Sequence, residues 1–126
     1  LPDELRQQGV KHRRFGRGRR TQPVAVGDAL HHLAIGRVDH KTGSIGLYDV
    51  GEGCATNEPV FVPRTPDSAE GEGFLLANVY DANRRATHLV VLDAMNVAAG
   101  PIAKAYLDHR VPFGFHGNWI SSSVAE

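Results

Sequence analysis

Short apolar stretches separated by glycine-, proline- and aspartate-containing turns are the feature that most constrains how this chain can fold. The clearest is Phe74–Asp81, along which successive side chains alternate between two faces. Further stretches predict strands at Leu30–Val38, Ser44–Val50, Pro59–Val62, Leu89–Leu92 and Ile102–Leu107. No segment has the apolar stripe of an amphipathic helix, and Ala94–Ala99 is too short to form one. The sequence therefore predicts an all-β fold.

Antiparallel strands joined by such turns are typical of a barrel, a sandwich or the blades of a propeller, and their spacing does not separate these architectures. One repeated detail hints at blades. Val38-Asp39 and Leu92-Asp93 each end a predicted strand just before a turn. The length of 126 residues suits one domain of ordinary size.

The charged residues give the chain as a whole no bias toward nucleic acid or a membrane, because 14 basic residues balance 14 acidic ones. Locally the first twenty residues are basic, with Arg6, Lys11, Arg13, Arg14, Arg17, Arg19 and Arg20. Phe15 is the only aromatic residue among them, whereas proteins that bind single strands stack bases on several aromatic side chains. We therefore expect a solvated arm and no nucleic-acid partner.

The cysteine content and the hydropathy favour a cytoplasmic protein. Cys54 is the only cysteine, so no internal disulfide can form and a reducing compartment is expected. It has no base beside it in the sequence, and we predict that it is unreactive. No apolar run reaches the length of about 18 residues needed to span a membrane, and no signal peptide is recognisable. The chain begins with Leu1, which we interpret as a sign of processing or of a longer protein.

The strongest candidate for chemistry is a histidine near the C-terminus. His116 lies between Phe115 and Gly117, so its imidazole projects from a tight and largely apolar segment. Burial there would disfavour the charged ring and leave a nitrogen lone pair for a metal ion. The alternative is a core histidine that is hydrogen-bonded to the backbone, and the residues alone leave both interpretations open.

Other residues that could carry chemistry lack a supporting arrangement. The chain has neither a His-Glu-x-x-His pair nor a Cys-x-x-Cys pair, which are the strong local zinc patterns. His31 and His32 are neighbours on a predicted strand and so face opposite sides. We expect His40 and His88 to be solvated. The run Ser121–Ser123 lacks the Gly-x-Ser-x-Gly turn of a serine nucleophile.

A second candidate is Glu58, which immediately precedes an apolar strand flanked by prolines. A carboxylate at the end of a strand is most often a surface residue. The functional alternative is a carboxylate that orients a metal-bound histidine by hydrogen-bonding its other ring nitrogen.

Taken together, several linked segments resemble the carotenoid cleavage oxygenase family, which includes stilbene-cleaving dioxygenases. The matching segments are Glu58–Arg64, Glu70–Leu76, Val79–Ala82, Leu89–Ala94, Pro101–Ala103 and Arg110–Trp119. Upstream, Gly9–Phe15 is similar to a basic strand region of the same family. The resemblance extends over nearly the whole chain, and the order of the segments makes it more specific than any one of them.

The resemblance implies a seven-bladed β-propeller with Fe²⁺ on its axis, held by four histidines. His116 would be the last of these ligands, and Glu58 one of the glutamates that hydrogen-bond the ligands. Neutral imidazoles suit Fe²⁺. Phe115 would line the apolar tunnel that holds a polyene or stilbene, whereas Phe113 and Trp119 are expected to pack.

The reaction implied by the resemblance is cleavage of a conjugated C=C bond of a carotenoid, apocarotenoid or stilbene by O₂, which gives two carbonyl products. The resemblance does not assign a ligand role to any other histidine of this chain, so three ligands would lie upstream. We therefore expect residues 1–126 to be a single partial domain, the C-terminal blades of a longer propeller. Such a piece would be inactive alone and would expose strand edges.

Two further expectations complete the prediction. Members of the family often take their substrate from a membrane, so peripheral membrane contact of the full-length protein is expected. The alternative function is a non-catalytic binding module of the β-propeller type, which the absence of three further histidines upstream would favour.

Overall fold

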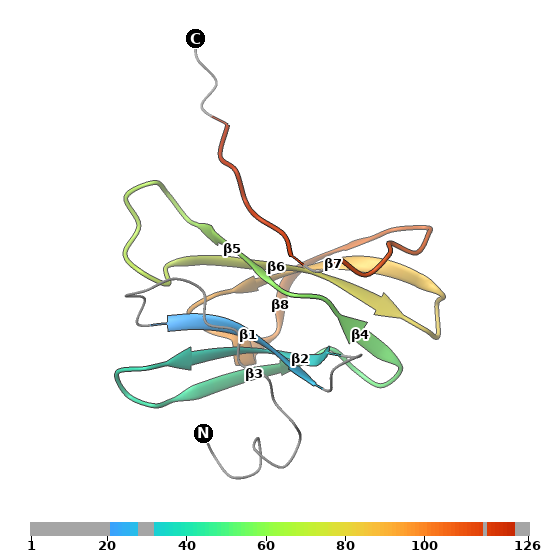
Figure 1. Ribbon diagram of the computed structural model, residues 1–126, viewed down its shortest axis with the longest axis horizontal. Coiled ribbons are helices and arrows are strands. Elements are labelled where there is room, and N and C mark those ends of the chain that lie inside the picture. The colour runs from blue at the N-terminus through green and yellow to red at the C-terminus, as the bar shows by residue number, and fades with distance from the viewer. Residues whose placement is uncertain (1–20, 28–31, 115, 123–126) are drawn as a thin grey trace.

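The computed structural model describes residues 21–27, 32–114 and 116–122. Within these ranges the chain forms eight strands and one short 3₁₀ helix, η1 (Figure 1). They are β1 (Thr21–Gly27), β2 (His32–Asp39), β3 (Ile45–Asp49), β4 (Cys54–Thr56), β5 (Val60–Pro63), β6 (Gly73–Asp81), β7 (Ala86–Asp93), η1 (Val97–Ala99) and β8 (Pro101–Tyr106). None of the described residues belongs to a helix long and apolar enough to cross a membrane.

All described strand pairs are antiparallel, which confirms the predicted all-β fold. The strands follow the order β1-β2-β4-β6-β7-β8, with β3 added to β2 and β5 added to β6. Figure 1 shows two groups of strands, β1 to β3 and β5 to β8, with β4 running between them. A single residue pair, His32 with Thr56, joins β2 to β4, so the two groups are separate layers rather than one continuous flat sheet.

The core lies between the two groups of strands. Burial alternates along β6, where Leu75, Ala77 and Val79 are buried and their neighbours are only partly buried. Buried residues of β2 and η1, Ile35 and Val97, belong to the same cluster. Burying each such aliphatic side chain contributes about 1.5–3 kcal/mol. The predicted alternation of Phe74–Asp81 is thus observed.

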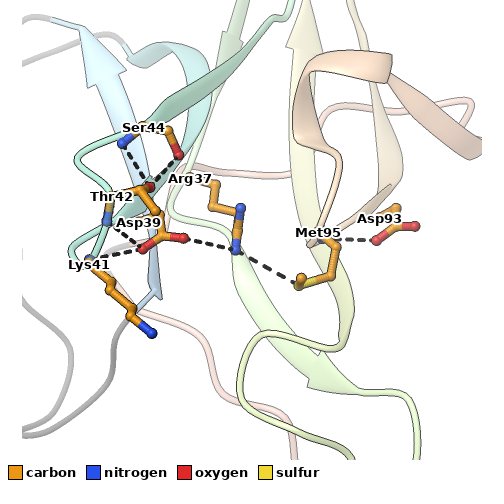
Figure 2. Close-up of polar contacts among 7 residues, drawn as sticks. All are labelled: Arg37, Asp39, Lys41, Thr42, Ser44, Asp93 and Met95. Atoms are coloured by element: carbon orange, nitrogen blue, oxygen red, sulfur yellow. Dashed lines mark hydrogen bonds and ion pairs between the residues drawn. The ribbon is translucent and has the colours of Figure 1, made fainter.

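Aspartates end several strands and begin the turns that follow. Asp39 accepts hydrogen bonds from the backbone N–H groups of Lys41 and Thr42, at 2.9 and 3.2 Å (Figure 2). These two bonds lower the pKa of the Asp39 carboxyl below its usual value. Asp93 accepts in the same way from the N–H of Met95 at 2.9 Å. The repeated detail seen in the sequence therefore reflects one turn chemistry used at two strand ends.

Arg37 connects the two groups of strands on the side of the molecule shown in Figure 2. Its Nη2 lies 4.0 Å from Oδ2 of Asp39 and 3.9 Å from Sδ of Met95, which follows β7. The contact is polar but weak, because a thioether is a poor acceptor. Packing of the core, rather than this contact, holds the two groups together.

The strand boundaries differ from the predicted ones in informative ways. β7 begins at Ala86, not at Leu89, because Ala86, Thr87 and His88 pair with residues of β6. The apolar pattern missed them, since only Ala86 is aliphatic. β4 was not predicted, since three residues beside a glycine corner carry no periodic signal. The basic cluster of the first twenty residues lies outside the described residues.

Candidate metal centre

Glu58 follows β4 and is held beside β6 by its neighbours. The N–H of Asn57 donates to the carbonyl of Asn78 at 3.2 Å, and the N–H of Asn78 donates to Oδ1 of Asn57 at 3.1 Å. The hydroxyl of buried Thr56 also donates to the carbonyl of Asn78, at 3.2 Å. These bonds continue the pairing of β4 with β6 by one further residue, so the position of Glu58 is set by the sheet.

His116 meets Glu58 directly, although 58 residues separate them in the chain. Nδ1 of His116 lies 3.1 Å from Oε2 of Glu58. An ionised carboxylate can only accept, so Nδ1 carries the proton, and in the neutral ring the lone pair then resides on Nε2. The Glu58 side chain is 15% exposed and that of His116 is 54% exposed, so the expectation that the imidazole is buried is wrong. The structure therefore brings the two predicted residues together in the orientation typical of metal-bound histidines, with the roles themselves still predictions.

A hollow of about 380 Å³ adjoins this pair. Apolar side chains supply much of its wall, and asparagines join His116 and Glu58 in lining it. The lining residues are Asn57, Glu58, Val60, Leu76, Ala77, Asn78, Leu89, Val111, Pro112, Gly114, His116, Gly117, Asn118 and Trp119. The hollow is thus formed between the outer face of β6 and β7 and the segment that carries His116.

The donor set in the described part of the chain fits one ligand of a metal and not a complete site. No group of three or more histidine, cysteine, aspartate or glutamate side chains that could hold a metal occurs among the described residues. His109 is exposed and hydrogen-bonds its neighbour Asp108, with 2.7 Å between Nδ1 and Oδ1. His12 and His31 lie outside the described residues, as does Phe115. Among the described residues, His116 therefore has no further metal ligands beside it.

The prediction that His88 is solvated is wrong. His88 is only 4% exposed, and its ring packs against Tyr106 with 5.3 Å between ring centroids. Its pairing with Val79 on β6 and Tyr106 on β8 places it inside the sheet, so a polar residue occupies a position that the sequence pattern assigns to an apolar one. Burial, with help from Lys104 and Arg84, lowers the pKa of His88 below the usual 6.5. His40, by contrast, is exposed in the turn after β2.

Three further residues singled out in the sequence are Phe113, Trp119 and Cys54. Phe113 packs edge-on against Tyr80, with 6.5 Å between ring centroids, and Trp119 lines the hollow. Burial, together with the charge and the hydrogen bond of Asp81, raises the pKa of the Cys54 thiol. A raised pKa keeps the thiol protonated and agrees with an unreactive Cys54.

The sequence matches the family described as retinal pigment epithelial membrane protein over residues 10–121. The chain belongs to this family. The resemblance to carotenoid cleavage oxygenases is thereby confirmed. Over 89 residues the chain is 45% identical to lignostilbene-alpha,beta-dioxygenase isozyme III of Sphingomonas paucimobilis, a match that covers 71% of this chain and 18% of the relative. It is 34% identical to apocarotenoid-15,15'-oxygenase of Synechocystis, with 79% of this chain and 24% of the relative covered.

Solved structures of carotenoid oxygenases have the same fold. A Synechocystis apocarotenoid oxygenase superposes with a TM-score of 0.78 at 32% identity, over 86% of this chain and 23% of that one. The lignostilbene dioxygenase of Pseudomonas brassicacearum gives 0.80 at 25% identity, over 86% and 25%. A cobalt-substituted form of the Synechocystis enzyme is among these neighbours. The prediction of antiparallel propeller blades is confirmed, and the chain spans about a quarter or less of these relatives.

Proposed function

We propose that this chain forms part of an oxygenase that cleaves a conjugated C=C bond of an apolar substrate with O₂, giving two carbonyl products. The substrate class is a carotenoid, an apocarotenoid or a stilbene. Residues 1–126 would be a single partial domain of that enzyme and inactive in isolation. The observation that carries the proposal is the contact between His116 and Glu58. Such a bond to Nδ1 orients the imidazole and leaves Nε2 to bind a metal, as is typical of metal-bound histidines.

His116 would be one of four histidine ligands of Fe²⁺, with the other three on parts of the protein outside this chain. A bound Fe²⁺ supplies the chemistry that binds and activates O₂. Glu58 would keep the Nδ1 proton of His116 in place, so that Nε2 presents its lone pair. Its partly buried negative charge would also moderate the positive charge of a site built from neutral ligands.

The hollow beside His116 supports an apolar substrate. Leu76, Leu89 and Val60 line it together with Val111 and Pro112 of the segment that carries His116. Aliphatic walls of this kind hold a conjugated molecule by packing rather than by charge. Phe115, next to His116 in the sequence, is proposed to add an aromatic wall.

The names of the relatives give the substrate classes to be tested first. The lignostilbene dioxygenase shares 45% identity with the chain, a carotenoid 9,10(9',10')-cleavage dioxygenase of Pisum sativum 42% and the apocarotenoid oxygenase 34%. Because these values do not separate the classes, a hydroxystilbene and an apocarotenoid are candidate substrates of equal standing.

The test is O₂ consumption by the complete gene product with a hydroxystilbene and with an apocarotenoid. We expect His116→Ala to abolish cleavage. His109→Ala is the matched control, because His109 also bonds a carboxylate through Nδ1, but that of its exposed neighbour Asp108, and it does not line the hollow. Cleavage that survives His116→Ala would show that the ligand assignment is wrong. A wild-type protein that binds no metal and consumes no O₂ would support the binding module instead.

A further inference from the structure

The segment that carries His116 has no regular secondary structure of its own. After β8 ends at Tyr106, the described residues from Leu107 onward form neither strand nor helix. The place of the imidazole therefore depends on where this segment is attached to the sheet. One buried side chain of β7 provides the attachment.

Thr87 is 1% exposed and makes three hydrogen bonds to the segment. The N–H of Leu107 donates to the Thr87 carbonyl at 3.0 Å, and the N–H of Thr87 donates to the His109 carbonyl at 2.9 Å. Any residue except proline could make those two backbone bonds at this position. The third bond needs a hydroxyl, because the N–H of Val111 donates to Oγ1 of Thr87 at 2.9 Å.

Stacked side chains also attach the segment to the sheet beside Thr87. Thr87 pairs with Tyr80 across β6 and β7. The guanidinium of Arg110 lies 4.9 Å from the centroid of the Tyr80 ring and 6.0 Å from that of Phe113. Cation–π contacts of this kind contribute about 0.5–1 kcal/mol each at exposed sites. The Val111 bond and the Arg110 stack thus come from adjacent residues and act at one point.

Only a short span separates this point from the candidate ligand. The five residues that follow Val111, up to and including His116, reach at most about 18 Å when fully extended. On the far side, a Cβ built on Gly117 would come within 3.0 Å of Cγ2 of Val60, so the chain passes tightly over β5. A displacement of about 1 Å at His116 would lengthen its 3.1 Å bond with Glu58 beyond hydrogen-bonding distance.

We propose that Thr87 is a positioning residue for His116, whose hydroxyl sets the register of the segment through Val111. One part of this inference rests on the proposed function: the effect of Thr87 on metal binding presupposes that His116 is a metal ligand. The attachment itself can be measured without a metal. Thr87→Val keeps the shape and removes the acceptor, and Thr87→Ser restores it.

The first experiment is hydrogen–deuterium exchange of the complete gene product over peptides that cover residues 107–119. We expect Thr87→Val to speed exchange there by about tenfold and Thr87→Ser to stay near wild type. The control for general destabilisation is Val97→Ala, since Val97 is a buried residue of η1 that packs near β2 and β3. Exchange over 107–119 that is the same in Thr87→Val and Val97→Ala would overturn the proposal.

The second experiment titrates the metal-free forms of the same proteins with Co²⁺ alone and records the visible absorption of the complex. We expect Thr87→Val to weaken the affinity by about tenfold, as is usual when a group supporting a ligand is removed, with Thr87→Ser within about twofold of wild type. If His116→Ala weakens binding but Thr87→Val does not, Thr87 does not position a ligand. If His116→Ala leaves binding unchanged while exchange over 107–119 still depends on Thr87, the attachment stands and the proposed function fails.

Discussion

The β6–β7 hairpin and the segment from Leu107 to Trp119 lie against each other but are held in place by different means. Eight consecutive residue pairs join β6 to β7, and one face of both strands lies in the core. Among the described residues, the backbone of the segment pairs with the sheet at Thr87, and side chains such as Tyr80 and Glu58 add further contacts. The hairpin is held by many contacts, so the loss of one leaves the others in place. The segment is held by few contacts, so the loss of one has a larger effect on its position.

This difference separates stability from function. A change in the hairpin has to disturb many contacts at once, so its effect is on the free energy of unfolding. A change in the segment removes few contacts and costs little stability, but it moves the candidate ligand. Methyl groups added at glycines of the two regions measure the difference directly.

The largest effect is expected at Gly73, the first residue of β6. A Cβ there would overlap the carbonyl oxygen of Val62 and lie 2.9 Å from Cα of Pro63, so the backbone of β5 would have to move. We expect Gly73→Ala to cost about 3 kcal/mol or more of stability, or to prevent folding. Gly114→Ala, where a Cβ meets nothing within 4 Å, is the control and should change stability by less than about 0.5 kcal/mol. Thermal unfolding of the complete protein measures both, and equal effects would break the comparison.

A smaller loss of stability with a larger loss of function is expected at Gly117. An added Cβ would lie 3.0 Å from Cγ2 of Val60, a side-chain tip that can give way. Gly117→Ala should therefore cost about 1 kcal/mol of stability and lower metal affinity by about tenfold. Adding Val60→Ala makes room and should restore much of the affinity. Failure of this rescue would show that the spacing over β5 does not control His116.

The smallest effect is a dependence of stability on pH through His88. Its pKa is lowered in the folded state, so below about pH 6.5 the unfolded chain binds a proton that the folded chain does not. The free energy of unfolding should therefore fall as the pH drops through this value. Above it His88 is neutral in both states, and its titration should not change the free energy of unfolding. His88→Phe keeps a ring beside Tyr106 and removes the titration. Unfolding midpoints of the two proteins at pH 5.5 and 7.5 give the test, and an equal acid loss in both would contradict it.

Local signals in the sequence were sufficient for much of the fold. The alternation along Phe74–Asp81 and the aspartates at positions 39 and 93 correspond to β6 and to two strand-ending turns. β4 could not be predicted, because a three-residue strand takes its position from its partner β6. His88 was misjudged for a related reason, since burial on a covered sheet face depends on the neighbouring strands.

The candidate site depended on a different kind of information. His116 and Glu58 were linked only through the family resemblance, since nothing in their spacing brings them together. The structure then showed the contact between them. Thr87 carried no sequence signal, because a threonine in a β-strand is ordinary and its hydroxyl matters only through the fold of residues 107–111.

The most direct test is the iron content of the complete gene product, measured by elemental analysis after purification with Fe²⁺. We predict equimolar iron in wild type and in His109→Ala, a reduced content in Glu58→Gln, and almost none in His116→Ala. His116→Ala protein that is folded and holds as much iron as wild type would contradict the central claim that His116 is a metal ligand oriented by Glu58.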